Sequence, residues 1–404
     1  MKKRIIKLFL ALFALVIFTN LSTAQVNMNR WIELTVQQGV EIWFDYSADA
    51  ANTEVKVVCG AYETTFVAGT ERMTFVNDST EATTMKVYGN LKEFVCINQY
   101  EKVTELDASN NTGLVVLHCW NNNLSSLNVS GLTILEELNC DENNLSSLDV
   151  SGLTALKEFY CSFNNLSSLD VSGLTALEYF NCSFNTLSSL GVSGLTALKD
   201  LVCAFNNLTS LDVNGLTVLK SLYCYTNNLS TIKISGCDSL NYIDCSGNNL
   251  SACGLDSLFH QLPRREADNK GHITIRDASY YDQPGAFSCR DTIATNRNWE
   301  VWDYTTPIIN SNYECPYFTL GIKELMVNNI NARVYPNPVS NYLNIECEES
   351  INKLELYDAF GRIVISQESV QNNTSIDVSS LANGIYILKL RTAEGVGEYK
   401  VVKD

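Results

Sequence analysis

A 21-residue period in the middle of the chain constrains its fold more than any other feature. The period is marked by seven cysteines, Cys119, Cys140, Cys161, Cys182, Cys203, Cys224 and Cys245. The text around each one repeats almost unchanged, as in LEELNCDENNLSSLDVSGLTA followed by LKEFYCSFNNLSSLDVSGLTA. A unit this short cannot bury its apolar face alone, whereas units stacked along an axis bury a continuous core. The period therefore predicts a solenoid of stacked turns.

Each turn matches the pattern L-x-x-L-x-C-x-x-N-x-L, so residues 91–250 closely resemble the leucine-rich-repeat family. The text from Leu91 to Cys96 resembles a degenerate first turn of the same kind. The resemblance implies an α/β-like solenoid with a parallel sheet on its concave side and a mostly irregular convex side. Parallel pairing of one short strand per turn also follows from stacking alone.

Two residue ladders are predicted to hold the turns together. An asparagine follows every cysteine by three positions, at Asn122, Asn143, Asn164, Asn185, Asn206, Asn227 and Asn248. We expect each asparagine side chain to satisfy backbone groups in a bend that water cannot reach. The seven cysteines are predicted to be small buried thiols rather than disulfides, because in-register side chains point the same way. Zinc binding is not expected, because there is no C-x-x-C pair.

The outward strand positions carry the candidate ligand contacts. Alternation along a strand sends Leu138 and Cys140 inward, while Glu137, Asn139 and Asp141 face outward. Stacking requires no particular residue at these outward positions, yet aromatic residues stand there beside acidic ones, which is typical of surfaces that contact proteins or glycans. The candidates are His118, Trp120, Asp141, Glu158, Tyr160, Tyr179, Tyr223, Tyr225 and Tyr242. As an alternative, the tyrosines only pack on one another along the stack.

Further positions of the repeat belong to the same prediction. The outward set is expected to include Val116, Ser162, Ser183, Ala204 and Ser246. A phenylalanine column occupies one position of three successive turns, at Phe163, Phe184 and Phe205. We expect these rings to form a stacked edge that stabilises the solenoid, with a ledge for a ligand as the alternative.

Open ends of a solenoid expose core and sheet edge, so caps are expected on both sides. Residues 25–90 contain short alternating runs such as WIELTV and EVKVVC, which predict a small all-β cap. Residues 251–326 are predicted to form the second cap and a linker. Its expected elements are a helix from Leu255 to Leu262, a strand from His272 to Arg276 and an aromatic run from Trp299 to Tyr304. A disulfide is plausible among Cys237, Cys253, Cys289 and Cys315, with the pairing open.

The first 24 residues have the layout of a secretory signal peptide. A basic start is supplied by Lys2, Lys3, Arg4 and Lys7. An apolar run from Leu8 to Phe18 follows, and Ser22-Thr23-Ala24 supplies small residues for cleavage. Because no later stretch is apolar enough to anchor the chain, an exported protein without a transmembrane anchor is expected. Its net charge of −17 argues against nucleic-acid and anionic membrane partners.

The last segment, residues 327–404, changes character. It contains Val334-Tyr335-Pro336-Asn337-Pro338, then KLELYD, then Gly361-Arg362, then LANGIY and a final lysine-containing strand. These motifs resemble the C-terminal sorting domain of the type IX secretion system. The resemblance implies a small β-sandwich that engages the secretion machinery and directs export across the outer membrane. The alternation in YLNIEC independently supports half-buried strands, and a generic immunoglobulin-like binding module is the alternative.

No catalytic motif was found in the chain. Three histidines, His118, His260 and His272, stand in different segments. The metalloprotease, phosphate-binding, dinucleotide-binding and hydrolase patterns are absent, so no enzyme, metal or cofactor is expected. The sequence favours a secreted or cell-surface, adhesin-like protein that binds a protein or polysaccharide on its concave face. The alternative function is a structural or self-associating component of the envelope or matrix.

Overall fold

The computed structural model describes residues 25–276, 286, 289–303, 332–358, 363–392 and 396–404. The predicted signal peptide lies outside the described residues. The chain divides into two compact units, Met1–Cys315 and Pro316–Asp404, and each has its own hydrophobic core. Among the helices that the structure describes, none has the length and apolar character needed to cross a membrane.

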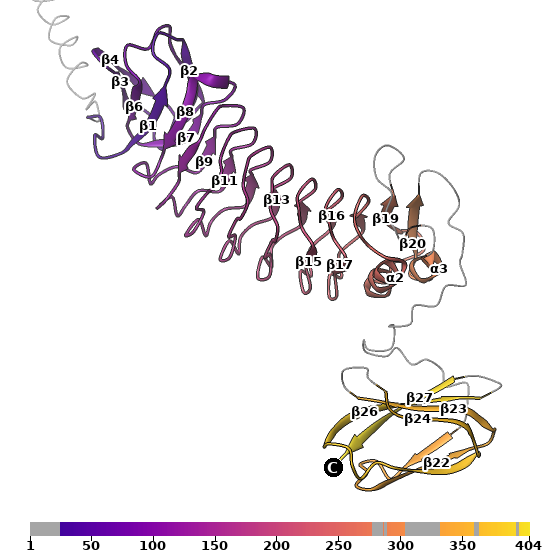
Figure 1. Cartoon of the computed structure of the whole chain (residues 1–404). Coiled ribbons are helices and arrows are strands. Elements are labelled where there is room, and N and C mark those ends of the chain that lie inside the picture. Colours follow the sequence, from indigo (N-terminus) through magenta and orange to yellow (C-terminus); the bar gives the residue numbers. More distant parts are fainter. Residues whose placement is uncertain (1–24, 277–285, 287–288, 304–331, 359–362, 393–395) are drawn as a thin grey trace, which may run out of the picture. The chain divides into compact units, whose positions relative to one another are not determined.

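The first unit is a solenoid whose turns each contribute one short strand to a common sheet (Figure 1). These strands are β9(Val116–His118), β11(Glu137–Asn139), β12(Glu158–Tyr160), β13(Tyr179–Asn181), β14(Asp200–Val202), β16(Ser221–Tyr223) and β18(Tyr242–Asp244). They pair in parallel with no register shift, so that Leu138 lies beside Phe159 and Phe159 beside Phe180. The 21-residue period places equivalent residues in contact, which keeps the sheet in register over the whole stack.

Opposite the sheet, the chain returns through bends and a second line of short strands. These are β10(Ser126–Asn128), β15(Ser210–Asp212) and β17(Thr231–Lys233). Within one turn, Leu138, Cys140, Leu145 and Leu153 are fully buried. Apolar side chains from the sheet and from the return thus meet in one core, which continues from turn to turn.

The asparagines three residues after each cysteine point into this core and bond to the backbone. Nδ2 of Asn185 donates to the carbonyl oxygens of Cys161, Cys182 and Ser183 at 2.9, 3.2 and 3.2 Å. Its Oδ1 accepts the N–H of Leu166 at 2.9 Å. The same bonds to two successive cysteine carbonyls recur at Asn122, Asn143, Asn164, Asn206, Asn227 and Asn248.

The ladder cysteines are buried thiols in the structure, and Cys96 continues their column by one turn. Burial raises the pKa of the Cys96 and Cys203 thiols to about 12, because an apolar core disfavours the thiolate. Such groups are neutral at physiological pH and fill the narrow space between the leucines.

The N-terminal end is closed by two sheets. Its elements are β1(Trp31–Val36), β2(Ile42–Ala48), β3(Thr53–Cys59), β4(Tyr62–Ala68), β5(Met73–Asn77), β6(Thr84–Tyr88), β7(Leu91–Val95), β8(Val103–Asp107) and a 3-10 helix, Tyr100–Lys102. Strands β5, β2 and β7 extend the solenoid sheet, since β2 is antiparallel to β7 and β7 is parallel to β9. The other strands form a sheet in the order β10-β8-β1-β6-β3-β4. Phe44, packed against Phe75 and Phe94, lies in the core between the two sheets.

The other end is closed by α2(Ala252–Gln261), β19(Gly271–Arg276), α3(Asp291–Thr295) and β20(Trp299–Asp303). The helix begins earlier than the expected Leu255, because Ser251 caps it and accepts the N–H of Gly254 at 3.1 Å. Strands β19 and β20 extend the solenoid sheet in parallel. At Gly271 a Cβ atom would lie 2.4 Å from the buried Trp299 ring, so this close contact requires glycine.

The four cysteines considered for a disulfide differ in state. Cys237 and Cys289 are buried thiols. Cys253 is disulfide-bonded, and Cys315 lies outside the described residues. The end cap is also held by an ion pair, in which the partly exposed Arg290 Nε lies 2.8 Å from Oδ2 of the buried Asp256.

The second unit contains two antiparallel sheets around one core. Its strands are β21(Ala332–Tyr335), β22(Tyr342–Cys347), β23(Ile351–Tyr357), β24(Ile363–Val370), β25(Asn373–Asp377), β26(Gly384–Arg391) and β27(Val396–Lys403). One sheet has the order β21-β22-β25 and the other β24-β23-β26-β27. Asn337 of the tyrosine-proline motif accepts the N–H of Val402 and donates to the carbonyl of Lys400. The motif is thereby fixed to the last strand.

We expect Asn185→Ala to lower the free energy of unfolding by about 1–3 kcal/mol, because it leaves the buried N–H of Leu166 without a partner and removes one of two donors from the carbonyls of Cys161, Cys182 and Ser183. Chemical denaturation followed by circular dichroism measures the loss. Asn165→Ala is the matched control, since Asn165 is exposed in the preceding turn and should change stability by less than about 0.5 kcal/mol. Equal losses in both variants would contradict the role of the buried amide.

Candidate ligand-binding face

The strand face is defined as the outward side chains of β9 to β18 together with the residue after each ladder cysteine. It carries five acidic side chains, Glu137, Asp141, Glu158, Asp200 and Asp244, which we call the acidic strip. Across these described positions the strand face contains no lysine or arginine. It is therefore an acidic surface built on a rigid sheet.

The predicted contact residues are all partly exposed on this face. They are His118, Trp120, Asp141, Glu158, Tyr160, Tyr179, Tyr223, Tyr225 and Tyr242. The expectation for five neighbouring residues was wrong, because Val116, Ser162, Ser183, Ala204 and Ser246 are buried. Each strand ends just before its cysteine. The four residues of this set that follow a cysteine therefore lie in the bend, where strand alternation no longer applies. Val116 is instead the first residue of β9 and is buried within that strand.

Four of the tyrosines form two pairs on neighbouring turns. The ring centroids of Tyr160 and Tyr179 are 4.9 Å apart, as are those of Tyr223 and Tyr242. The Tyr160 hydroxyl donates to Glu158 Oε2 at 2.9 Å. Burial, followed by the carboxylates of the acidic strip, raises the pKa of Tyr179 and Tyr223, so both phenols are neutral at physiological pH. The rings thus pack on one another and still present part of their surface to solvent.

His118 lies beside the acidic strip at its N-terminal end. Its Nε2 is 3.5 Å from Glu137 Oε2. Burial lowers the pKa of His118 below its ordinary value even though Glu137 opposes the shift. The imidazole is therefore mainly neutral at pH 7 and adds little positive charge to the face.

Asp141 is an unusual member of the acidic strip, because its carboxylate is largely desolvated. It accepts the N–H of Ser162 at 2.5 Å, and it forms no ion pair among the described residues. Burial raises the pKa of Asp141 to about 6, although the bond from Ser162 opposes the shift. A carboxylate that is desolvated without a cationic partner destabilises the fold, and such groups are concentrated at functional sites.

The phenylalanine row, defined as Phe163, Phe184 and Phe205, borders the strand face where the strands end. Successive ring centroids are 4.0 and 4.1 Å apart and the rings are stacked. The three residues have φ values of 51, 52 and 51°, the left-handed region that bulky residues rarely adopt. Each such residue costs about 1–3 kcal/mol, whereas each ring contact contributes only about 0.5–1.5 kcal/mol. The ring contacts offset part of the backbone cost, and partial burial of the Phe184 and Phe205 rings adds to this stabilisation.

Basic side chains lie beside the face, one position before the strands. Lys157 Nζ is 2.8 Å from Glu136 Oε2, and Lys199 Nζ is 2.5 Å from Glu178 Oε2. These lysines are thus paired with glutamates of the preceding turns rather than with the acidic strip. These two lysines therefore do not neutralise Glu158 or Asp200, the acidic side chains that follow them on the strand face.

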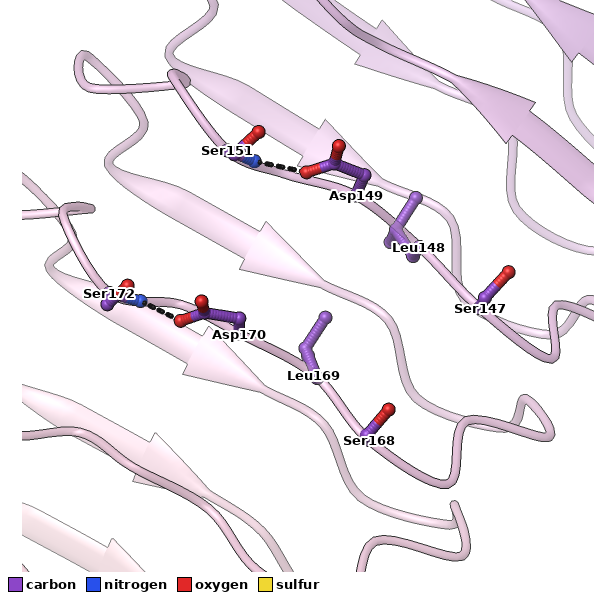
Figure 2. A pocket seen from close by; sticks show the side chains of 8 residues that line it. All are labelled: Ser147, Leu148, Asp149, Ser151, Ser168, Leu169, Asp170 and Ser172. Carbon is purple, nitrogen blue, oxygen red and sulfur yellow. Dashed lines mark hydrogen bonds between the residues drawn. The ribbon is translucent and has the colours of Figure 1, made fainter.

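The convex side carries a shallow groove between two turns (Figure 2). It is lined by Ser147, Leu148, Asp149, Ser151, Ser168, Leu169, Asp170 and Ser172. Asp149 and Asp170 accept the N–H groups of Ser151 and Ser172 at 2.9 and 2.8 Å, as Figure 2 shows. These bonds lower the pKa of both carboxyls, which act as turn caps. In the described part of the chain, no group of three or more His, Cys, Asp or Glu residues could hold a metal ion.

Stacked parallel turns, buried cysteine and asparagine ladders and capped ends define a leucine-rich-repeat solenoid. Residues 333–404 match the family described as the secretion system C-terminal sorting domain. The match covers most of the second unit and agrees with the type IX tail expected from the motifs. The protein is therefore secreted or carried on the outer cell surface.

Three solved structures are similar to this chain. The functional domain of InlJ from Listeria monocytogenes, which includes a cysteine ladder, is 21% identical, with a TM-score of 0.34 over 81% of this chain and 94% of that one. The leucine-rich repeat domain of APL1B is 18% identical, with a TM-score of 0.37 over 48% and 56%. YopM from Yersinia enterocolitica WA-314 is 23% identical, with a TM-score of 0.31 over 41% and 38%. No curated protein matches the sequence.

We expect Asp141→Asn to raise the free energy of unfolding by roughly 1–3 kcal/mol near pH 7. The folded-state pKa of Asp141 is raised to about 6 from an ordinary value of 3.8, so the unfolded state binds fewer protons between these values. The free energy of unfolding of the parent protein should therefore fall as pH rises from about 4 to 6. The variant should lose this part of the pH dependence.

Thermal or denaturant unfolding of both proteins over this pH range tests the prediction. Below about pH 4 the two proteins should have similar stability, because Asp141 is then protonated in both states. A variant that is less stable than the parent near pH 7 would show that the carboxylate is stabilised by its surroundings.

Proposed function

We propose that this protein is an exported, adhesin-like binding protein that captures a macromolecular ligand, a protein or a glycan, on the strand face. The sorting domain supports a location where such ligands are present. The solenoid supports the face with a rigid sheet, so the outward side chains are held in place before a ligand arrives. We assign the protein no enzymatic activity and no cofactor.

The single observation that carries this proposal is that partly exposed tyrosines lie among the carboxylates of the acidic strip. Tyr160 and Tyr223 stand at an outward position that is occupied by Asn139 and Val202 in neighbouring turns. The stacking of turns therefore does not require tyrosine there. Tyrosine supplies a large contact area together with a polar hydroxyl, and it is enriched among residues that dominate binding energy. The two tyrosine pairs flank Asp200, so aromatic and acidic groups share the centre of the face.

The first test is a screen of the purified protein against arrays of extracellular-matrix proteins, host glycans and bacterial polysaccharides. We expect a ligand whose affinity falls about tenfold or more when Tyr160 and Tyr223 are both changed to alanine, because a central aromatic anchor contributes about 2 kcal/mol or more. Affinity is measured by surface plasmon resonance, and circular dichroism verifies that the variant is folded.

The matched control changes Ile134 and Val218 to alanine. Both are exposed apolar residues that lie shortly before a strand and outside the strand face. Their replacement should leave the affinity for the ligand within about twofold of that of the parent protein. Loss of assembly without loss of a soluble ligand would favour a structural or self-associating component. Equal loss in both variants, or no ligand at high protein concentration, would remove the strand face as the binding surface.

A further inference from the structure

The phenylalanine row stacks along the solenoid, but the fold of the turn does not require a ring at this position. The same backbone position holds Asn121, Glu142 and Thr226 in other turns with φ values of 54, 53 and 53°. The turn therefore forms without a ring, and at Asn121 it does so with a residue that is better suited to the left-handed region. Phe163, at the start of the row, is 49% exposed. An apolar ring at a strained and solvent-accessible position suggests contact with another molecule.

The stacking of the row limits what it can contact. Interplanar angles of 10 and 16° show that the rings of Phe163, Phe184 and Phe205 cover one another's faces. Tyr225 then closes the row, packing edge-on against Phe205 at 5.4 Å. Within the row Phe184 and Phe205 therefore present mainly edges to solvent, whereas Phe163 has a ring stacked on one face alone. The three rings form an apolar ridge that aliphatic chains can cross, rather than a platform on which a flat ring could stack.

The acidic strip meets the first ring of the ridge at Asp141. Asp141 accepts the N–H of Ser162, the residue immediately before Phe163. Glu158 and Asp200 follow on β12 and β14, beside Tyr160 and Tyr179. Side chains that combine an aliphatic stem with a cationic head can therefore lie across the ridge and place their charge at the carboxylates. Lysine and arginine have this combination.

We propose that the phenylalanine row and the acidic strip form one docking surface for a lysine- and arginine-rich segment of another protein. This inference rests on the proposed function and names the class of ligand. Charge complementarity selects the occupant, because the strand face holds five carboxylates and no lysine or arginine among its described positions. A second copy of this chain is disfavoured, since each copy has a net charge of −17. Sulfated or carboxylated glycans are disfavoured for the same reason.

The test measures binding of the full chain to an oligolysine peptide, with oligoglutamate of the same length as the comparison. The variant Glu158→Gln, Asp200→Asn, Asp244→Asn removes three charges from the strand face. Glutamine can still accept the Tyr160 hydroxyl, and asparagine at 244 can accept the Ser246 N–H as Asn181 accepts that of Ser183. We expect this variant to bind oligolysine about tenfold more weakly or worse.

A matched control removes three charges from the opposite side through Asp149→Asn, Asp170→Asn and Asp212→Asn. Asparagine preserves the cap at such positions, since Asn128 accepts the N–H of Ser130 in an earlier turn. The control should stay within about twofold of the parent, because exposed charges farther than a Debye length are screened at physiological salt. Equal weakening in both triple variants would overturn the proposal, since binding would then follow net charge alone.

The ridge is tested separately by Phe163→Asn, Phe184→Asn, Phe205→Asn, with the single variant Phe163→Asn beside it. Asparagine occupies this backbone position at Asn121, so the midpoint of thermal unfolding should not fall. Oligolysine affinity should fall about tenfold in the triple variant and by a smaller factor in the single one.

Unchanged affinity in the folded variants, or tighter binding of oligoglutamate, would overturn the proposed ligand class. If the triple phenylalanine variant fails to fold, the oligolysine affinity of Phe163→Asn relative to the parent protein tests the ridge instead. A ligand from the arrays could require Tyr160 and Tyr223 and still bind the carboxylate variant and the phenylalanine variants normally. That result would support the proposed function and contradict only the lysine- and arginine-rich ligand inferred here.

Discussion

The hydrogen bonds of the buried asparagines are the interaction on which the rest of the solenoid depends. Each turn bends sharply after its strand, and the bend places backbone donors and acceptors inside an apolar core, where leaving them unpaired is costly. An asparagine side chain supplies two donors and an acceptor close to the backbone. Asn164 uses them to join the carbonyls of Cys140 and Cys161 and the N–H of Leu145. Because these partners belong to successive turns, the same bonds that satisfy the bend also hold the strands in register.

A sheet held in this way determines what can happen on its outer face. The inward positions are occupied by leucine, phenylalanine and cysteine, and the outward positions are free to differ from turn to turn. Strand β12 carries Glu158 and Tyr160 where β14 carries Asp200 and Val202, with no change in pairing. The outward side chains are therefore positioned by the stack but not required by it. Such a surface can be adapted to a ligand while the core stays unchanged, and its rigidity reduces the entropy lost on binding.

Much of this architecture could be predicted from the sequence, because the 21-residue period identifies equivalent positions directly. The burial of Leu138 and Cys140 follows from one alternating strand, and alternation also located most strands of the N-terminal cap. The burial of Ser162 could not be read in this way, because alternation does not reveal that the strand ends before the cysteine. The raised pKa of Asp141 is due to burial of its carboxyl group in the folded stack, which no local pattern of the sequence contains. The left-handed backbone of the phenylalanine row did leave a signal, since the same column contains Asn121 and Gly247.

Acidic residues on the convex side and on the strand face have opposite pKa shifts, and this difference bears on function. On the convex side Asp149 and Asp170 cap turns, with pKa values lowered by the bonds they accept. These carboxylates stabilise the fold and need no ligand. On the strand face Asp141 is desolvated with a raised pKa, and the phenylalanine row lies in a strained backbone region beside it. Both features oppose folding and both lie on the side whose residues the stack leaves free. Residues that oppose folding on a face that the stack leaves free are expected where a surface is shaped by binding.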